Sequence, residues 1–91
     1  MSVHVRVPTI LRSYTDGDSE VTVEGSTLSE VLDALEASYS GIRSRIVDET
    51  GELRRFVNVY VGNDDVRFLD ALDTKTPDGA QVSVIPAVAG G

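Results

Sequence analysis

The sequence predicts a single α+β domain in which one main helix packs across a mixed sheet of four or five strands. Three observations carry this prediction: valines alternate with other residues in several short segments, one helical stripe lies between them, and turn signals separate them. A chain of 91 residues forms one domain and buries about 60–65% of the surface that it exposes when unfolded. Such a domain has little room for a deep internal active site.

Two strands are predicted before the helix. Residues 3–7 alternate valine with polar side chains, which is the period of a half-buried strand, and Pro8 ends it or places it at an edge. Asp16-Gly17-Asp18 is a turn signal, and Val21 and Val23 belong to a second alternating segment. This order favours an antiparallel pair joined by a long loop.

The helix is predicted from its cap and its apolar stripe. Thr27 and Glu30 form a capping box, in which the Thr27 hydroxyl accepts from the Glu30 amide and the Glu30 side chain reaches back. Gly41 is expected near the helix C-terminus, and Ile42 and Ile46 are expected to anchor a short turn after it. The stripe at helical spacing consists of Leu28, Val31, Leu32, Leu35 and Tyr39.

The second half of the chain predicts three further strands. Phe56–Val61 is the strongest, residues 62–65 are a turn, Val66–Phe68 is expected as a short strand, and Val82–Ile85 is the last strand, closed by Pro86. With one helix in the middle, the first and last strands would most naturally lie parallel at the centre of the sheet. That arrangement is the β-grasp fold of ubiquitin. We therefore expect a β-grasp domain over residues 1–86 and a C-terminal tail over residues 87–91.

Composition excludes several classes of function. The formal net charge is −7, whereas a nucleic-acid binder needs clustered Lys and Arg. No apolar segment approaches the roughly 20 residues that span a bilayer, and the N-terminus enters a strand pattern at once, so we expect a cytoplasmic protein without a signal peptide. With no cysteine and a single histidine, His4, neither a metal site nor a thiol nucleophile is expected. No self-contained enzyme is predicted.

The tail is the candidate for chemistry. Ala87, Val88, Ala89, Gly90 and Gly91 are all small and, when extended, reach roughly 17 Å from the domain, so they can enter a narrow channel in a partner enzyme. Glycine at the end leaves the terminal carbonyl unobstructed. A carboxylate needs activation before acyl chemistry, and since the chain has no phosphate-binding loop, the ATP site would belong to the partner. If the protein carries sulfur, the absence of cysteine means that the sulfur would have to sit on the terminal carboxyl group.

These features resemble the ubiquitin-like sulfur carriers of the ThiS/MoaD family, which serve the thiamin, molybdopterin and cysteine pathways. The resemblance runs over nearly the whole chain, and three of its segments, residues 7–12, 53–56 and 86–91, are most similar to the actinobacterial carriers of the cysteine pathway. It also rests on the Thr27-Leu28 helix start, the Phe56–Val61 strand, Asp78-Gly79 before Val82–Pro86, and the Gly-Gly end.

The resemblance implies a cycle of partner enzymes. An adenylyltransferase and sulfurtransferase of the ubiquitin-E1-like class would adenylate Gly91, and a thiocarboxylate would form. A PLP-dependent cysteine synthase would use it, and a JAMM-type zinc metallopeptidase would release cysteine. ATP, zinc and PLP would belong to these partners, and the carrier would bind no cofactor. Molybdopterin, thiamin and a thiosugar or secondary metabolite stay open as final sulfur acceptors.

A docking surface for such partners is expected on the sheet. If the alternate valines of the last two long strands face the helix, then Phe56, Tyr60 and Ile85 lie on the open face beside the root of the tail. An apolar patch with a polar rim is typical of a protein interface. Two other functions stay open: a protein modifier joined through Gly91 to lysines of its targets, and a plain β-grasp binding module with an inert tail.

Overall fold

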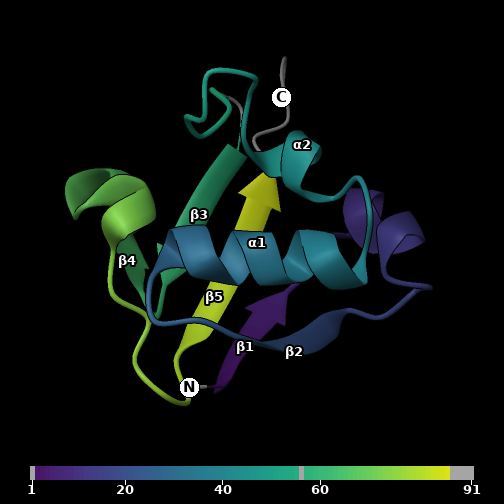
Figure 1. Ribbon diagram of the computed structural model, residues 1–91, viewed down its shortest axis with the longest axis horizontal. Coiled ribbons are helices and arrows are strands. Elements are labelled where there is room, and N and C mark those ends of the chain that lie inside the picture. Colours follow the sequence, from purple (N-terminus) through teal and green to yellow (C-terminus); the bar gives the residue numbers. More distant parts are fainter. Residues whose placement is uncertain (1, 56, 87–91) are drawn as a thin grey trace.

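The computed structural model describes residues 2–55 and 57–86, so the predictions that concern Phe56 and the tail at 87–91 lie outside the described residues. The described strands and helices follow the predicted order along the chain (Figure 1). They are β1 (Ser2–Arg6), η1 (Thr9–Tyr14), β2 (Glu20–Glu24), α1 (Leu28–Ser38), α2 (Arg43–Ile46), β3 (Val57–Val61), β4 (Asp64–Asp65), η2 (Val66–Phe68), η3 (Ala71–Asp73) and β5 (Gln81–Pro86), where η denotes a 3-10 helix.

The sheet has the order β2-β1-β5-β3-β4, and α1 crosses one of its faces (Figure 1). β1 and β5 lie parallel, with Val5 opposite Val82, whereas the other neighbouring strands are antiparallel. The first and last strands therefore lie side by side inside the sheet, and the predicted β-grasp fold is confirmed.

The core lies between the sheet and α1. The stripe of α1 and the alternate valines of the three inner strands are buried, since removing apolar surface from water drives the two layers together. Each large apolar side chain buried in this way contributes about 1.5–3 kcal/mol. The residues concerned are Val3, Val5, Leu28, Val31, Leu32, Leu35, Val57, Val59, Val82 and Val84, while the predicted Tyr39 is only partly buried against them.

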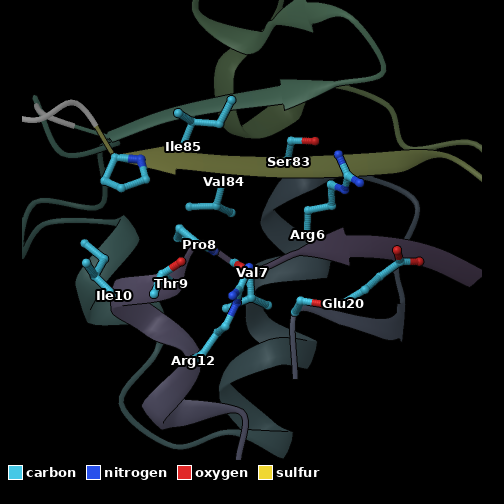
Figure 2. Close-up of a pocket in the computed structure, with 12 residues that line it drawn as sticks. Arg6, Val7, Pro8, Thr9, Ile10, Arg12, Glu20, Ser83, Val84 and Ile85 are labelled. Carbon is cyan, nitrogen blue, oxygen red and sulfur yellow. Dashed lines mark hydrogen bonds between the residues drawn. The ribbon is translucent and has the colours of Figure 1, made fainter. Parts of the chain in front are cut away.

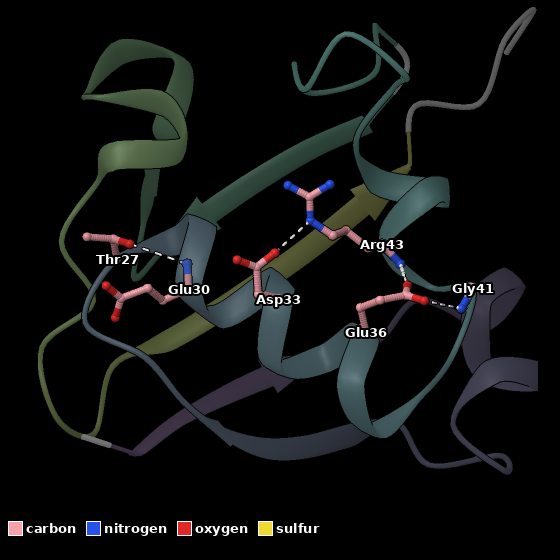
Figure 3. Close-up of polar contacts among 6 residues, drawn as sticks. All are labelled: Thr27, Glu30, Asp33, Glu36, Gly41 and Arg43. Atoms are coloured by element: carbon pink, nitrogen blue, oxygen red, sulfur yellow. Dashed lines mark hydrogen bonds and ion pairs between the residues drawn. The ribbon is translucent and has the colours of Figure 1, made fainter.

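The N-terminus of α1 is capped as predicted, with one difference. The Thr27 hydroxyl accepts from the Glu30 amide at 3.3 Å (Figure 3). The Glu30 carboxylate reaches back one residue further than a capping box requires, because it accepts from the Ser26 amide at 2.9 Å and the Ser26 hydroxyl at 2.8 Å. The Thr27 contact satisfies a helix amide that has no partner within the helix, and the Glu30 contacts hold Ser26 just before the cap.

A second carboxylate joins α1 to α2. Glu36 accepts from the Gly41 amide at 2.8 Å through one oxygen and from the Arg43 amide at 3.0 Å through the other (Figure 3). Arg43 also pairs with Asp33 of α1 at 3.0 Å. Gly41 has a φ of +95°, which glycine adopts without the penalty of a β-carbon, so the chain turns sharply between the helices. This turn positions the buried Ile46, as the sequence predicts.

Replacing Glu36 by Gln is expected to lower stability at neutral pH and to have little effect in acid. The Gly41 amide, followed by the Arg43 amide, holds the pKa of Glu36 below its usual value. The stability that the charged Glu36 carboxylate gives the folded state is therefore fully present above about pH 4.5. It is lost as the pH falls through the lower pKa that Glu36 has in the folded state. Urea unfolding of the wild type and of Glu36→Gln at pH 7 and pH 3 measures the difference.

The matched control is Glu49→Gln, at an exposed position of the loop before β3. It is expected to change the unfolding midpoint much less than Glu36→Gln does at pH 7. If the free energy of unfolding differs between the wild type and Glu36→Gln by the same amount at pH 7 and pH 3, the charged Glu36 carboxylate is not the source of the stabilisation.

The predicted short strand at Val66–Phe68 is wrong. The pairing instead occurs just before it, where Asp64 and Asp65 lie opposite Val61 and Tyr60, and Val66–Phe68 is the 3-10 helix η2. The physical reason is local: the Asp65 carboxylate accepts from the Arg67 amide at 2.8 Å and so starts a helical turn. Val66 is fully buried and anchors that turn to the core.

Candidate functional site at the root of the tail

The site lies where β5 ends and the tail begins. β3 pairs with β5 as far as Pro86, opposite Val57, whereas β1 pairs with it only as far as Ser83, opposite Arg6. After Arg6 the chain leaves the sheet and enters η1. A gap therefore opens beside the last residues of β5, at the position from which the tail departs.

This gap forms an open groove of about 580 Å³. Figure 2 shows Ile85 and Ser83 on β5 across from Pro8, Thr9 and Ile10. Ile10 is 68% exposed and Ile85 is 48% exposed, so both sides of the groove present apolar surface to solvent. The charged side chains along it are Arg6, Arg12 and Glu20, and Arg12 is held in place because its Nε donates to the Val7 carbonyl oxygen at 3.2 Å.

The described part of the predicted docking surface lies on the expected face. Along β3 and β5, Val59 and Val84 point into the core, so Tyr60 and Ile85 point to the open face of the sheet. Ile85 lies opposite Asn58, which places Tyr60 on the diagonal, where neighbouring residues are about 7–8 Å apart and within reach of an aromatic side chain. Phe56 lies outside the described residues, and the docking role of this surface stays a prediction.

Sequence reasoning missed the η1 side of the groove. The stretch from Val7 to Arg12 supports the resemblance to sulfur carriers, but its alternation ends at Pro8 and does not predict the 3-10 helix beyond that residue. The parallel pairing of β1 with β5 places Ile10 and Arg12 on the groove that Ile85 also lines. The only sequence feature that could have indicated this groove is the presence of two apolar residues, Ile10 and Ile85, outside the predicted core. A single sequence does not show that these two residues line the same groove.

The single histidine and the acidic side chains are the remaining groups of chemical interest. Within residues 2–55 and 57–86, no three His, Asp or Glu side chains gather as a metal site would require. His4 lies on the open face of β1, with its Nδ1 3.3 Å from the Thr22 hydroxyl and 3.6 Å from a Glu20 carboxylate oxygen. In the same described ranges, no helix is long and apolar enough to cross a membrane. Gly91 and the four residues before it lie outside the described residues, and Pro86 is the last residue of β5.

Comparison with known proteins agrees with this architecture. The model of the ThiS family matches residues 5–91. The sulfur carrier protein CysO of Mycobacterium tuberculosis is 50% identical to this chain over 93 residues, and the match covers 100% of both chains. The crystal structure of the Amycolatopsis orientalis BexX/CysO complex contains a chain that is 45% identical, with a TM-score of 0.93, covering 98% of this chain and 99% of that one.

A further relative has a different name. Small archaeal modifier protein 3 of Haloferax volcanii is 41% identical over 68 residues, which cover 75% of this chain and 73% of the relative. The full-length match to CysO and the family match over residues 5–91 agree with the fold, in which β5 lies at the centre of the sheet. The family predicted from the sequence motifs is confirmed: the chain belongs to the ThiS family.

Proposed function

We propose that this protein is a sulfur carrier whose terminal Gly91 is adenylated and converted to a thiocarboxylate that donates sulfur, most directly to cysteine biosynthesis. One observation carries the proposal: the end-to-end similarity to proteins named sulfur carrier protein CysO, at 50% identity. The groove and the open sheet face beside the root of the tail support it, because they provide a place for an enzyme to hold the domain. The protein would act as a co-substrate, and catalysis would lie in its partners.

The proposed chemistry has two steps. The Gly91 carboxylate attacks the α-phosphate of ATP, so that pyrophosphate leaves and an acyl adenylate forms. Hydrosulfide from a sulfur donor then attacks the acyl carbon and displaces AMP, which leaves a thiocarboxylate. The chain itself supplies the carboxylate and the docking surface, while the activating enzyme supplies the ATP site.

The partners implied by this proposal are enzymes rather than cofactors. They are an E1-like activating enzyme, a PLP-dependent cysteine synthase or another sulfur-accepting synthase, and a JAMM-type zinc metallopeptidase. ATP, PLP and zinc would be bound by those proteins. The Amycolatopsis orientalis crystal structure supports such assemblies, since a CysO protein there forms a complex with BexX. Because the cycle consumes ATP, we propose a cytoplasmic location.

The direct test is the intact mass of the protein after incubation with the activating enzyme, ATP and sulfide. The expected result is a gain that corresponds to the replacement of one oxygen by sulfur at Gly91. The control omits ATP and is expected to leave the mass unchanged. If no exchange occurs and deletion of Gly90-Gly91 has no effect in cells, a binding module with an inert tail replaces the proposal.

Truncating the docking surface is expected to weaken activation. Ile85→Ala and Tyr60→Ala should each raise the KM for the carrier by about 10-fold with little change in kcat, because a central interface side chain contributes about 1 kcal/mol or more. Phe56→Ala, chosen from the sequence alone, is expected to act in the same direction. The measurement is ATP–pyrophosphate exchange at varied carrier concentration.

Gln81→Ala is the matched control, since Gln81 is exposed on the same face of β5 at the opposite end of the strand. It is expected to leave the KM unchanged. If Ile85→Ala and Tyr60→Ala behave like Gln81→Ala, the open face is not the docking surface.

A protein modifier is the second candidate, and the similarity to small archaeal modifier protein 3 favours it. The two functions share the fold, the activation step and the tail. They differ in the product, because a modifier forms isopeptide bonds from Gly91 to lysines of other proteins. Lys75 is the only lysine of the chain, so side-chain-linked chains of this protein would have one acceptor. Mass spectrometry of adducts from cell extract separates the two functions.

A further inference from the structure

A second apolar surface lies at the β4 edge of the sheet, away from the groove. Phe68 is 87% exposed and its neighbour Leu69 is 47% exposed. We call these two residues the η2 patch. Phe68 is one of only two phenylalanines in the chain, and aromatic side chains are enriched at protein interfaces relative to the rest of the surface. Neither the tail chemistry nor the groove uses this pair.

Local contacts order the backbone that carries the η2 patch. Val66 is fully buried, the Asp65 carboxylate accepts from the Arg67 amide at 2.8 Å, and the Leu69 amide donates to the Val66 carbonyl at 3.0 Å. These contacts fix the turn that presents Phe68. Because this backbone is already ordered, less conformational entropy is lost when a partner covers Phe68.

A chain of contacts joins the η2 patch to the root of the tail. The Arg67 guanidinium donates to the Asn58 side-chain oxygen at 2.7 Å and to the Arg54 carbonyl oxygen at 2.7 Å. Asn58 lies opposite Ile85 in the sheet. The Arg67 and Asn58 side chains therefore link η2 to the face of the sheet that carries Ile85. A partner that covers this face across β3 meets Arg67, the residue before Phe68.

The charges around the patch indicate the chemistry of that partner. Residues 62–73 contain four aspartates and one arginine, so this segment carries a net charge of −3. Arg67 is engaged by Asn58 and Arg54, whereas Asp70 and Asp73 are exposed beside the patch. Both aspartates, with Glu52, line a shallow groove of about 360 Å³ that also contains the apolar Leu53 and Leu72. A complementary surface has an apolar pocket flanked by Lys or Arg.

We propose that the η2 patch, with Asp70 and Asp73 at its rim, is a second docking anchor for the enzyme that adenylates Gly91. The inference rests on the proposed function, and the activating enzyme is the one partner that both the carrier and the modifier require. A specific protein interface buries about 800 Å² on each side, more than the five small residues of a tail supply. The activating enzyme must therefore hold the folded domain, and an exposed phenylalanine next to Arg67, which contacts the sheet face of Ile85 through Asn58, fits that need.

The test uses the full chain and its activating enzyme. Phe68→Ala is expected to raise the Kd, measured by calorimetry without ATP, and the KM for the carrier by at least about 10-fold, with kcat retained. Leu69→Ala is expected to have a smaller effect in the same direction. Because Phe68 and Leu69 are exposed, the thermal unfolding midpoints of both variants should match that of the wild type.

A charge-reversal pair tests the chemistry of the rim. Asp70→Lys with Asp73→Lys is expected to weaken binding by at least about 10-fold at low salt and by less at high salt, because screening reduces the repulsion. Asp16→Lys with Asp18→Lys changes the net charge equally in the loop before β2 and is the control. If the two pairs have equal effects, only net charge matters and the proposed rim is wrong.

The outcomes separate the η2 patch from the proposed function. If the wild type forms no thiocarboxylate but binds the enzyme through Phe68, the proposed function fails and the docking anchor stands. If Phe68→Ala leaves Kd and KM within about 2-fold of the wild type, the anchor is overturned, whatever happens at Gly91. If Phe68→Ala weakens only the sulfur-accepting synthase, the assignment to the activating enzyme is wrong. A wild type that fails to bind the activating enzyme also overturns it.

Discussion

A chain that lacks Gly91 is expected to form thiocarboxylate at least about 1,000-fold more slowly than the full chain. Its new terminal carboxylate, on Gly90, lies one residue short, and an extended residue spans about 3.3–3.6 Å. A displacement of about 1 Å from the reacting position already costs about 100-fold in rate. The measurement is the rate of oxygen-to-sulfur exchange by intact mass, with the activating enzyme, ATP and sulfide in excess.

Ala89→Gly is the matched control for this truncation, since it alters the tail without changing its length. It is expected to retain a rate within a few-fold of the wild type, because the terminal carboxylate keeps its reach. A shortened chain that reacts at the wild-type rate would show that the sulfur is not placed at Gly91. The position of the carboxylate, rather than the folded domain, is what this comparison tests.

Leu32→Ala is expected to destabilise the domain by about 2–5 kcal/mol, the range for a fully buried leucine replaced by alanine. Small domains have total stabilities of about 5–15 kcal/mol, so this is a large fraction. Since 1 kcal/mol shifts the midpoint of a domain of this size by roughly 4–8 °C, the thermal midpoint should fall by at least about 10 °C. Circular dichroism during heating measures it.

Ser38→Ala serves as the control because Ser38 is exposed on the last turn of the same helix. Its expected effect on the free energy of unfolding is within about 0.5 kcal/mol. If Leu32→Ala were equally mild, the contact between α1 and the sheet would not be the main source of stability. At room temperature, Leu32→Ala is expected to retain activation as long as most molecules stay folded, since Leu32 lies in the core.

Much of the fold was predictable because it depends on local periodicity. Alternating valines predicted β1, β3 and β5, and the leucine stripe with Thr27 predicted α1. Periodicity failed at Val66–Phe68, where the Asp65 carboxylate competes for a backbone amide and turns the chain into a 3-10 helix. It also missed the partner of Glu30, which depends on how the chain enters the helix at Ser26.

The sequence by itself led to the predicted place of the chemistry. An acidic chain without cysteine, with five small residues after Pro86 and glycine at the end, makes the Gly91 carboxyl group the predicted place to hold sulfur. It also determined which strand faces are apolar, because side-chain direction alternates along a strand whatever its neighbours are.

Only the tertiary structure decided which surfaces surround the tail. The groove exists because β1 stops pairing with β5 at Ser83, so that Ile10 and Ile85 line the space that opens between η1 and β5. The exposure of Phe68 follows from the buried Val66 before it and the edge position of β4. Both features depend on contacts between residues far apart in the chain. A single sequence does not record such contacts, because its patterns report only the geometry of neighbouring residues.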